Sequence, residues 1–350
     1  MAWKQTCGSM AYLNPQITIA GGGLAGLSLA CALRLRGVEV TVQEAGSYPR
    51  HRVCGEFISG VTEETLKNLG ILDLFSDARR HQSLAWHDQG RLVHRTQFPE
   101  AAYGISRYRL DERIRQKLES LGGKIETGVR ARLESREGLV WAAGRRPCNG
   151  PWIGLKAHVR GIPMTADLEI YVGSNGYTGL AEVEDGWVNV CGLFQLNRQT
   201  KAKPINLLAS YIEAGGNGRL AQKLETARWR EGSFSAVAGF QLGKQPKNHG
   251  LLCVGDSESM IPPFTGNGMS MAFQAAEAAT GPLVAWADGA ITWAEATAQV
   301  NQRLEKKFHR RLGVAQAMHH LILSKAGRCL FHAAAATGIL PFRPLLSLIR

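Results

Sequence analysis

The glycine-rich segment at residues 21–26 carries the strongest chemical signal in the chain. Its sequence, GGGLAG, matches the pattern G-x-G-x-x-G. In that pattern Gly21 permits a tight turn, Gly23 lets a pyrophosphate approach the backbone, and Gly26 lets a helix pack closely on a strand. An apolar run precedes the segment, a helical stretch follows it, and Glu44, a candidate partner for ribose hydroxyls, ends the next predicted strand. The spacing therefore predicts a dinucleotide site.

Two further segments extend this pattern. Residues 255–257 read GDS, and residues 262–269 read PPFTGNGM and lead into an Ala-rich helix. Residues 107–114 read RYRLDERI. In their order along the chain (21–26, 107–114 and 255–269), the three segments resemble the fingerprints of one FAD-dependent superfamily. It joins para-hydroxybenzoate hydroxylase-like monooxygenases, squalene epoxidase, flavin halogenases and geranylgeranyl reductases. The resemblance runs from residue 17 to about residue 285 and implies FAD as the cofactor.

The resemblance also implies roles for matched positions. Asp256 would bind the ribityl chain, Arg107 would lie beside the pyrophosphate, and Val129 would offer its backbone to the adenine. Residues 266–269 would place N–H groups at the flavin pyrimidine edge, where a helix N-terminus stabilises negative charge by roughly 0.3–1 kcal/mol. The complete expected cofactor-binding set is Gly21, Gly23, Leu24, Ala25, Gly26, Glu44, Arg107, Val129, Asp256, Pro263, Gly266, Asn267, Gly268 and Met269.

Residues 52–57, RVCGEF, resemble the loop beside the flavin in geranylgeranyl reductases. Cys54 and Glu56 are therefore candidate catalytic residues, because either could give a proton near the ring. The alternative is that Cys54 packs as a small apolar group and Glu56 is a surface carboxylate. The seven Cys include no CxxC pair, so we expect no metal site and no disulfide scaffold.

The resemblance implies an FAD-dependent oxidoreductase. We expect a monooxygenase that hydroxylates or epoxidises a lipophilic or aromatic metabolite through a flavin C4a-hydroperoxide. The alternatives are a geranylgeranyl-reductase-like enzyme that reduces alkene double bonds and a non-catalytic FAD-binding scaffold. NAD(P)H is the expected transient reductant. Residues 142–146, AAGRR, carry Ala where the monooxygenase branch has Asp, so an electron-donor protein is the alternative source of electrons.

The elements that must position these residues follow from hydrophobic patterning. Residues 17–20 and 38–42 read as strands and residues 24–36 as the helix between them, which makes a parallel βαβ unit. The apolar runs at 138–144 and 250–256 read as further strands of the same sheet. Residues 152–196 alternate in short segments typical of antiparallel sheet, and residues 204–226 read as one or two helices.

The predicted fold class is therefore α/β: a Rossmann-like FAD-binding domain of the glutathione-reductase type with an inserted antiparallel β-rich substrate domain and a C-terminal helical region. Three discontinuous stretches would form the FAD-binding domain: 17–78, 104–148 and 248–298. The substrate domain would comprise 79–103 and 149–247, and the helical region would be 299–350.

The chain has 350 residues and a formal charge of +12, from 41 Lys and Arg against 29 Asp and Glu. This charge favours anionic ligands, but no nucleic-acid-binding signature accompanies it. After Trp293 apolar residues recur every three or four positions with basic residues between them, which predicts a helix packed on the body or, alternatively, on a membrane surface. The first sixteen residues show no export signal, so we expect a cytoplasmic protein, with peripheral membrane contact as the alternative.

Overall fold

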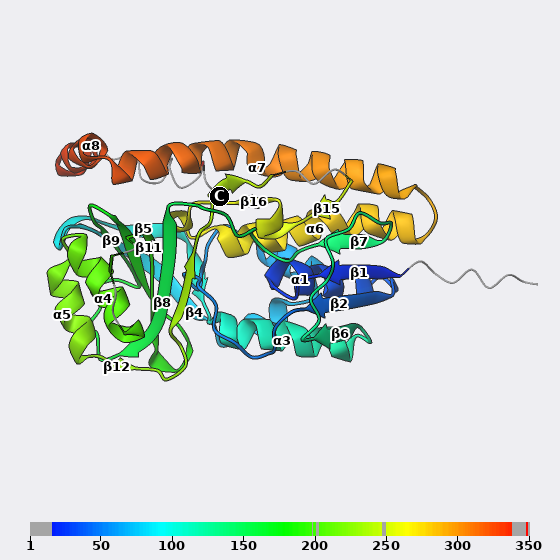
Figure 1. The fold of residues 1–350 in the computed structure, drawn as a ribbon, viewed down its shortest axis with the longest axis horizontal. Helices are drawn as coiled ribbons and strands as arrows, with labels where there is room; N and C mark the ends of the chain where they lie inside the picture. The colour runs from blue at the N-terminus through cyan, green and yellow to red at the C-terminus, as the bar shows by residue number, and fades with distance from the viewer. Residues whose placement is uncertain (1–15, 198, 201–202, 247–249, 338–347, 349–350) are drawn as a thin grey trace, which may run out of the picture.

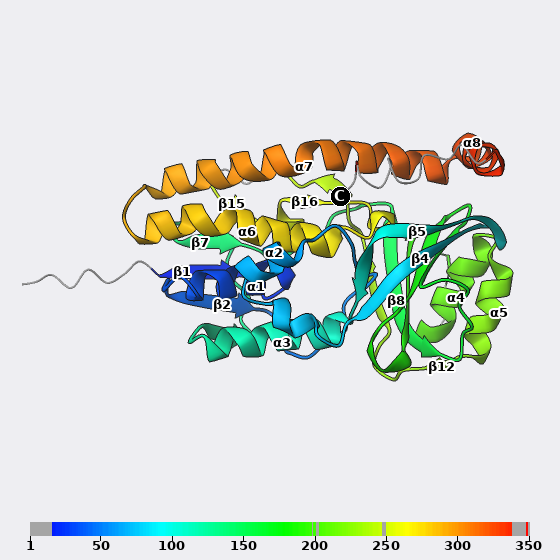
Figure 2. The same ribbon diagram turned by 180° about the vertical axis from the view of Figure 1, so that it is seen from behind.

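The computed structural model describes residues 16–350 except 198, 201–202, 247–249, 338–347 and 349–350, so the segment considered for an export signal lies outside the described residues. The molecule is built on two large sheets that lie side by side (Figures 1 and 2). One belongs to the nucleotide-binding half and the other to the β-rich half. This arrangement confirms the predicted fold class.

The nucleotide-binding sheet is parallel throughout its five strands. Its order is β15 (Leu252–Cys253), β7 (Leu139–Trp141), β1 (Ile17–Ala20), β2 (Val40–Glu44) and β6 (Lys124–Thr127). Helix α1 (Leu24–Arg34) is buried on nearly all sides because it lies between α6 (Gly268–Ala287) and α3 (Arg107–Ser120). This explains why its sequence is apolar all round rather than on one stripe.

The second sheet has nine strands. They run in the order β12 (Arg228–Trp229), β8 (Trp152–Arg160), β11 (Val188–Gln195), β10 (Gly176–Glu182), β9 (Leu168–Val172), β4 (Arg79–Asp88), β5 (Arg91–Gly104) and β3 (Phe57–Ile58), with β13 (Ser235–Ala238) also paired to β8. All its pairs are antiparallel except β4 with β9. Helices α4 (Pro204–Ala214) and α5 (Gly218–Thr226) cover its outer face, and its inner face looks towards the nucleotide-binding half (Figure 1).

The remaining helices and strands lie around these two sheets. They are α2 (Glu63–Asn68), the two-stranded sheet β14 (Gly243–Lys244) with β16 (Ser259–Met260), α7 (Trp293–Leu323) and α8 (Lys325–Ala336). Helix α7 begins at a capping box formed by Thr292 and Glu295 and runs along both halves of the molecule (Figures 1 and 2). Among the described residues, every helix is too short or too polar to span a bilayer.

Candidate functional site

A cavity of about 940 Å³ runs from the nucleotide-binding half to the inner face of the nine-stranded sheet. Ligand and cofactor pockets usually occupy roughly 300–1,000 Å³, so this cavity can hold a large molecule. Twelve of the fourteen expected cofactor-binding residues line it; they are Gly21, Gly23, Leu24, Ala25, Glu44, Arg107, Val129, Asp256, Pro263, Gly266, Gly268 and Met269. The three sequence fingerprints therefore meet in one place.

The glycine turn between β1 and α1 forms one wall of the cavity. Gly21 has a φ of 109°, and a Cβ there would lie 2.4 Å from the carbonyl oxygen of Ala142. A Cβ on Gly26 would lie 2.0 Å from the carbonyl oxygen of Gly21, so Gly26 serves helix packing, as predicted, rather than the cavity lining. At Gly23 a Cβ would meet nothing nearer than the Arg107 guanidinium at 3.9 Å, so this position opens directly onto the cavity.

Two helix N-termini point their unpaired N–H groups at this cavity. Helix α1 begins after Gly23 with no side-chain cap and no acidic residue in its first turn. Helix α6 begins after Asn267, also without a side-chain cap, and its first two residues line the cavity. Open helix N-termini attract anionic groups because their N–H groups lack partners and the helix dipole is positive there.

The turn before α6 is tightly held. Gly266 adopts a left-handed φ of 66°, and a Cβ there would lie 2.7 Å from the Phe57 ring. Asn267 is fully buried beside Ser59, whose hydroxyl donates to its side-chain oxygen over 3.2 Å, and the Asn267 N–H donates to Thr265. Asn267 therefore does not line the cavity, and it shapes the turn that directs its neighbours inward.

Glu44 ends β2 at the cavity edge and is 5% exposed. Its carboxylate accepts hydrogen bonds from the N–H groups of Gly22 and Gly46 at 2.9 and 2.8 Å, and pairs with Arg50 and Arg52 at 2.7 and 3.4 Å. Burial by itself raises the pKa of Glu44, but these donors outweigh burial and lower it below its usual value. Glu44 is therefore an ionised acceptor, as recognition of ribose hydroxyls requires.

The arginines beside Glu44 make this end of the cavity positive. Arg107 forms a bidentate pair with the fully buried Asp111, at 2.6 and 2.8 Å, and Arg52 pairs with the same carboxylate at 3.0 Å. The charged lining residues here and along the rest of the cavity are Arg50, Arg52, Arg107, Arg130, Arg145, Glu44 and Asp256. Five lining cations against two lining carboxylates leave the cavity positive, which suits an anionic group such as a pyrophosphate.

The opposite end of the cavity is apolar. Its walls come from the inner face of the nine-stranded sheet and from the segments that follow β13 and β16: Leu168, Ile170, Tyr177, Leu193, Val237, Phe240, Met260 and Phe264. Gly179 adds a flat, open position, since a Cβ there would meet nothing nearer than 3.9 Å. This end suits a lipophilic or aromatic molecule and excludes water from it.

Cys54 lines the cavity between its polar and apolar ends. Burial raises the pKa of its thiol, although the nearby Arg107 charge opposes this, so the thiol keeps its proton at neutral pH. The Asn189 side-chain amide donates to the Cys54 carbonyl over 2.9 Å and fixes the loop against β11. Cys54 thus lines the cavity as a protonated thiol and not as a thiolate.

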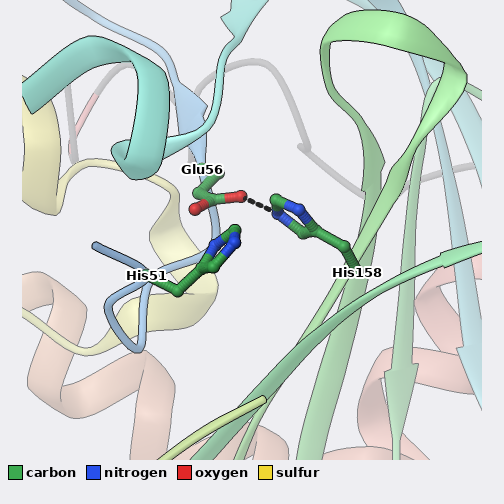
Figure 3. A group of neighbouring side chains, drawn as sticks. All are labelled: His51, Glu56 and His158. Carbon is green, nitrogen blue, oxygen red and sulfur yellow. Dashed lines mark hydrogen bonds and ion pairs between the residues drawn. The ribbon is translucent and has the colours of Figure 1, made fainter. Parts of the chain in front are cut away.

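Glu56, the other candidate from this loop, is fully buried and does not line the cavity. The interpretation of Glu56 as a surface carboxylate is therefore wrong. Its φ of 53° lies in the left-handed region, which a non-glycine residue adopts only when its surroundings enforce it. Those surroundings are the Arg107 N–H at 3.0 Å and the Lys156 ammonium at 3.2 Å. They also include the His158 ring at 2.5 Å (Figure 3).

Lys156, His158 and His51 complete this buried group, which we call the Lys–Glu–His cluster (His51, Glu56, Lys156 and His158). The ligand-capable atoms of the two histidines and Glu56 lie within 4.8 Å of one another. The Lys156 ammonium lies 2.9 Å from His51 Nδ1 and 3.2 Å from a Glu56 oxygen, so it already supplies the positive charge this group needs. We therefore assign the group as an ion network and not as a metal centre.

The sequence analysis missed Lys156 and His158. They alternate with Leu155 and Ala157 along β8, a pattern that normally places polar residues in solvent. Instead both polar residues are fully buried, because the loop of residues 50–57 covers that face of the strand. A nine-residue strand with buried residues at seven successive positions has no solvent face, and only the packing of another segment on it could have revealed this.

The cavity fits FAD on structural grounds. One end combines two open helix N-termini, a glycine cradle and surplus positive charge, and the other end is flat and apolar. A dinucleotide with an apolar tricyclic ring needs both ends in one continuous space. The residues that would hold it are those of the three fingerprints, together with Arg52 and Arg145, which extend the positive lining.

Comparisons with known proteins agree with this assignment. Residues 14–148 match the family model described as FAD binding domain. Menaquinone reductase of Mycobacterium tuberculosis is 27% identical over 122 residues, which cover 34% of this chain and 30% of that protein. Squalene epoxidase 4 of Arabidopsis thaliana is 34% identical over 136 residues, covering 35% of this chain and 26% of that protein. The chain thus matches less than a third of the length of these relatives.

The fold comparison extends over almost the whole chain. The p-nitrophenol 4-monooxygenase PnpA from Pseudomonas putida DLL-E4 superposes with a TM-score of 0.75 at 14% identity, covering 95% of this chain and 97% of that one. The prediction of an FAD-binding domain is therefore confirmed by the family match, and the predicted fold by this likeness. Residues 14–148 are thus similar to the FAD binding domain family, and the chain as a whole has the fold of the p-nitrophenol 4-monooxygenase.

Proposed function

We propose that this protein is an FAD-dependent monooxygenase that hydroxylates or epoxidises a lipophilic or aromatic substrate. The observation that carries the proposal is the two-ended cavity, in which one continuous space joins a phosphate-binding end to an apolar end. Relatives named for menaquinone and squalene, two apolar molecules, support a lipophilic substrate. Bound FAD would supply the redox chemistry, and the chain would supply binding, orientation and a dry pocket.

The chain's own residues have distinct tasks in this reaction. The N–H groups that follow Gly23 and the Arg107 guanidinium would neutralise the pyrophosphate, and Glu44 would bind a ribose. The open N-terminus of α6 would stabilise negative charge on the ring system. The apolar wall around Ile170 and Phe240 would hold the substrate and exclude water. The overall balance is substrate, O₂, reductant and one proton giving oxygenated substrate, oxidised reductant and water.

A second function is favoured by Cys54. A thiol that keeps its proton beside the cavity could complete the reduction of an alkene, in which hydride adds to one carbon and a proton to the other. This reaction consumes one reductant and one proton and needs no O₂. A third alternative, a non-catalytic FAD-binding scaffold, predicts that no donor reduces the bound cofactor in a productive cycle.

Product analysis separates the three functions. The purified protein is loaded with FAD and supplied with squalene or a menaquinone as substrate probe under ¹⁸O₂. The reductant is NADPH or NADH, and dithionite serves as the chemical control. Gain of one labelled oxygen supports the monooxygenase. Gain of two hydrogens under argon supports the reductase. Absence of product after full reduction by dithionite, over a panel of apolar alkenes and arenes, supports the scaffold, and a protein that does not bind FAD rejects all three.

A further inference from the structure

The inner face of the nine-stranded sheet changes character along β8 and its neighbour β11. Towards the apolar end it presents Leu193 and Gly154, and towards the opposite end it presents Lys156 and His158, both with 0% exposure. Burying an ammonium group costs several kcal/mol unless it is paired, so its position needs an explanation. The nine-stranded sheet already has an apolar core without it, which points to a role in the chemistry of the cavity.

Within the Lys–Glu–His cluster, only His51 lines the cavity. Its Nδ1 accepts a hydrogen bond from the Lys156 ammonium over 2.9 Å, so the ring proton resides on Nε2. Behind it, the Glu56 carboxylate forms an ion pair with Lys156 at 3.2 Å and accepts a hydrogen bond from the His158 Nε2–H over 2.5 Å. His51 is half-buried, whereas the other three are fully buried. The cluster thus forms a chain of two hydrogen bonds and one ion pair that reaches the cavity at His51.

The charges that face His51 come from every element packed against it. They are Lys156 and His158 of β8, Glu56 of the same loop, and Arg230 beyond β12, with the Tyr108 ring of α3 stacked on the imidazole at 4.7 Å. Burial and the Lys156 charge lower the pKa of His51 to about 3, while Glu56 opposes them. The His51 ring is therefore neutral at physiological pH and can relay a proton rather than store one.

We propose that His51 is a catalytic proton relay for the flavin cavity, that Lys156 is its internal proton donor, and that Glu56 and His158 are positioning residues that hold Lys156 in place. The inference rests on the proposed function, since both candidate reactions consume one proton in each turnover. Among the described residues that line the cavity, His51 is the only side chain whose two nitrogens can bind one proton while releasing another.

The relay step balances within the cluster. The Nε2–H bond of His51 breaks as its proton passes to an acceptor in the cavity, while an N–H bond of the Lys156 ammonium breaks and a new Nδ1–H bond forms. The products are a neutral Lys156 amine, a neutral His51 in the opposite tautomer and one protonated acceptor. Uptake of a solvent proton at Nε2, with return of the Nδ1 proton to Lys156, restores the first state. Glu56 stays ionised throughout.

The first test needs no turnover. Nitrogen-15 NMR of histidine-labelled full-length protein should show His51 as the Nε2–H tautomer, neutral down to about pH 4. In Lys156→Met the His51 pKa should rise by at least one unit, because a neighbouring positive charge is gone. Lys156→Arg should leave it low, because the charge is kept. The exposed His309, on α7, provides the control, because His309→Gln should change neither the tautomer nor the pKa of His51. An Nδ1–H tautomer, or a titration that Lys156→Met does not shift, overturns the relay.

The second test measures the rate of the proton-consuming step in the FAD-loaded protein. His51→Gln should lower the rate of the proton-consuming step by about 10²–10⁴-fold and change its pH dependence, with little effect on FAD affinity. Lys156→Arg should be nearly as slow, because a guanidinium keeps the charge but does not release a proton. If the Lys156→Met protein does not fold, the double variant Glu56→Gln with Lys156→Met is used in its place, because it removes both charges of the pair together. A His51→Gln rate within twofold of wild type, with the same pH profile, overturns the relay.

The two tests distinguish this inference from the proposed function. If the wild-type protein binds FAD but makes no product, the proposed function fails, and the NMR test still decides whether the hydrogen-bonded relay exists. If product forms and His51→Gln behaves as wild type, the relay fails and the proposed function stands.

Discussion

Gly23 and Gly26 belong to the same motif, but Gly23 keeps the cavity open and Gly26 allows the helix to pack closely on the glycine turn. A methyl group on Gly23 would extend into the cavity and meet only the Arg107 guanidinium, at 3.9 Å, whereas one on Gly26 would lie 2.0 Å from a backbone oxygen. We expect Gly23→Ala to change the free energy of unfolding of the FAD-free protein by less than about 1 kcal/mol and to weaken FAD binding at least tenfold. Gly26→Ala should impair both. Thermal unfolding without FAD and quenching of flavin fluorescence measure the two effects, and equal loss of stability in both variants contradicts this division.

Glu56 and Lys156 form a buried pair whose members depend on each other. Glu56→Gln leaves the ammonium without its carboxylate and should cost about 3–5 kcal/mol in the free energy of unfolding. The double variant Glu56→Gln with Lys156→Met should cost clearly less than the sum of the two single changes. Urea unfolding of the four proteins gives the coupling energy. Strict additivity would show that the pair does not act as a unit.

The same carboxylate makes stability depend on pH. Burial raises the pKa of Glu56, but Lys156, His158 and the Arg107 N–H overcome this and lower it to about 2, from 4.5 for the free side chain. Because the folded pKa is the lower one, the stabilisation is complete above pH 4.5 and is lost as the pH falls towards 2. Between pH 5 and pH 2.5, the free energy of unfolding should fall more steeply with decreasing pH for wild type than for Glu56→Gln. Parallel curves would mean that Glu56 does not carry this charge.

The sequence could predict the cofactor site at the level of single residues, but not the ion network behind it. Gly21, Gly23 and Glu44 were identifiable because each has a backbone or charge requirement that spacing alone expresses. Lys156 and His158 were not, because their chemistry depends on a loop about one hundred positions away in the chain packing over them. Alternation within a strand indicates two faces, but it does not say what covers each face.

At the scale of single elements, helix α7 is notable for one buried histidine, His319. His319 is 4% exposed among the rings of Trp152, Tyr177 and Phe264, and neither of its nitrogens has a hydrogen-bond partner among the described residues. The sequence analysis did not single out His319. The α7 stripe at Val300, Leu304 and Phe308 is buried as predicted, and near the helix end Ile322 packs against the nine-stranded sheet.

We expect His319 to weaken the folded state in mild acid. Burial and the neighbouring His320 lower its pKa to about 4, from 6.5. The unfolded chain therefore binds more protons between these values, and stability should fall from pH 6.5 to pH 4 by up to about 1.4 kcal/mol per unit. His319→Leu should flatten this slope and match or exceed wild-type stability at pH 7, because an unpaired buried polar group is removed. The exposed His309→Gln is the control, and an unchanged slope in His319→Leu rejects the argument.

Element boundaries show where local patterning is sufficient. Helix α1 was predicted at 24–36 and ends at Arg34, and strand β2 was predicted at 38–42 and spans Val40–Glu44. Types and order were correct because the glycine turn and β-branched runs determine them. The ends differ because the sheet register, in which Ile17 pairs with Val40, decides where β2 begins, and register depends on the partner strand.

At the scale of the whole molecule, the cavity draws its lining from both large sheets, so ligand binding should stabilise them together. At an FAD concentration one hundred times the dissociation constant, the free energy of unfolding should rise by about 2.7 kcal/mol. We expect far-ultraviolet circular dichroism and fluorescence of Trp152 and Trp187, in the substrate half, to report the same FAD-dependent rise in melting temperature. A substrate half that melts at a temperature independent of FAD would contradict a shared cavity.

The strand order β15–β7–β1–β2–β6 has a consequence for how the protein is made. The ribosome delivers β1, β2, β6 and β7 early, then most of the nine-stranded sheet, and only afterwards β15 and α6. A nascent chain therefore exposes an incomplete parallel sheet, with its outermost β7 edge open, throughout synthesis of the inserted half. The coenzyme therefore cannot be fully enclosed until Asp256 and the first turn of α6 have been synthesised, because these residues line its cavity.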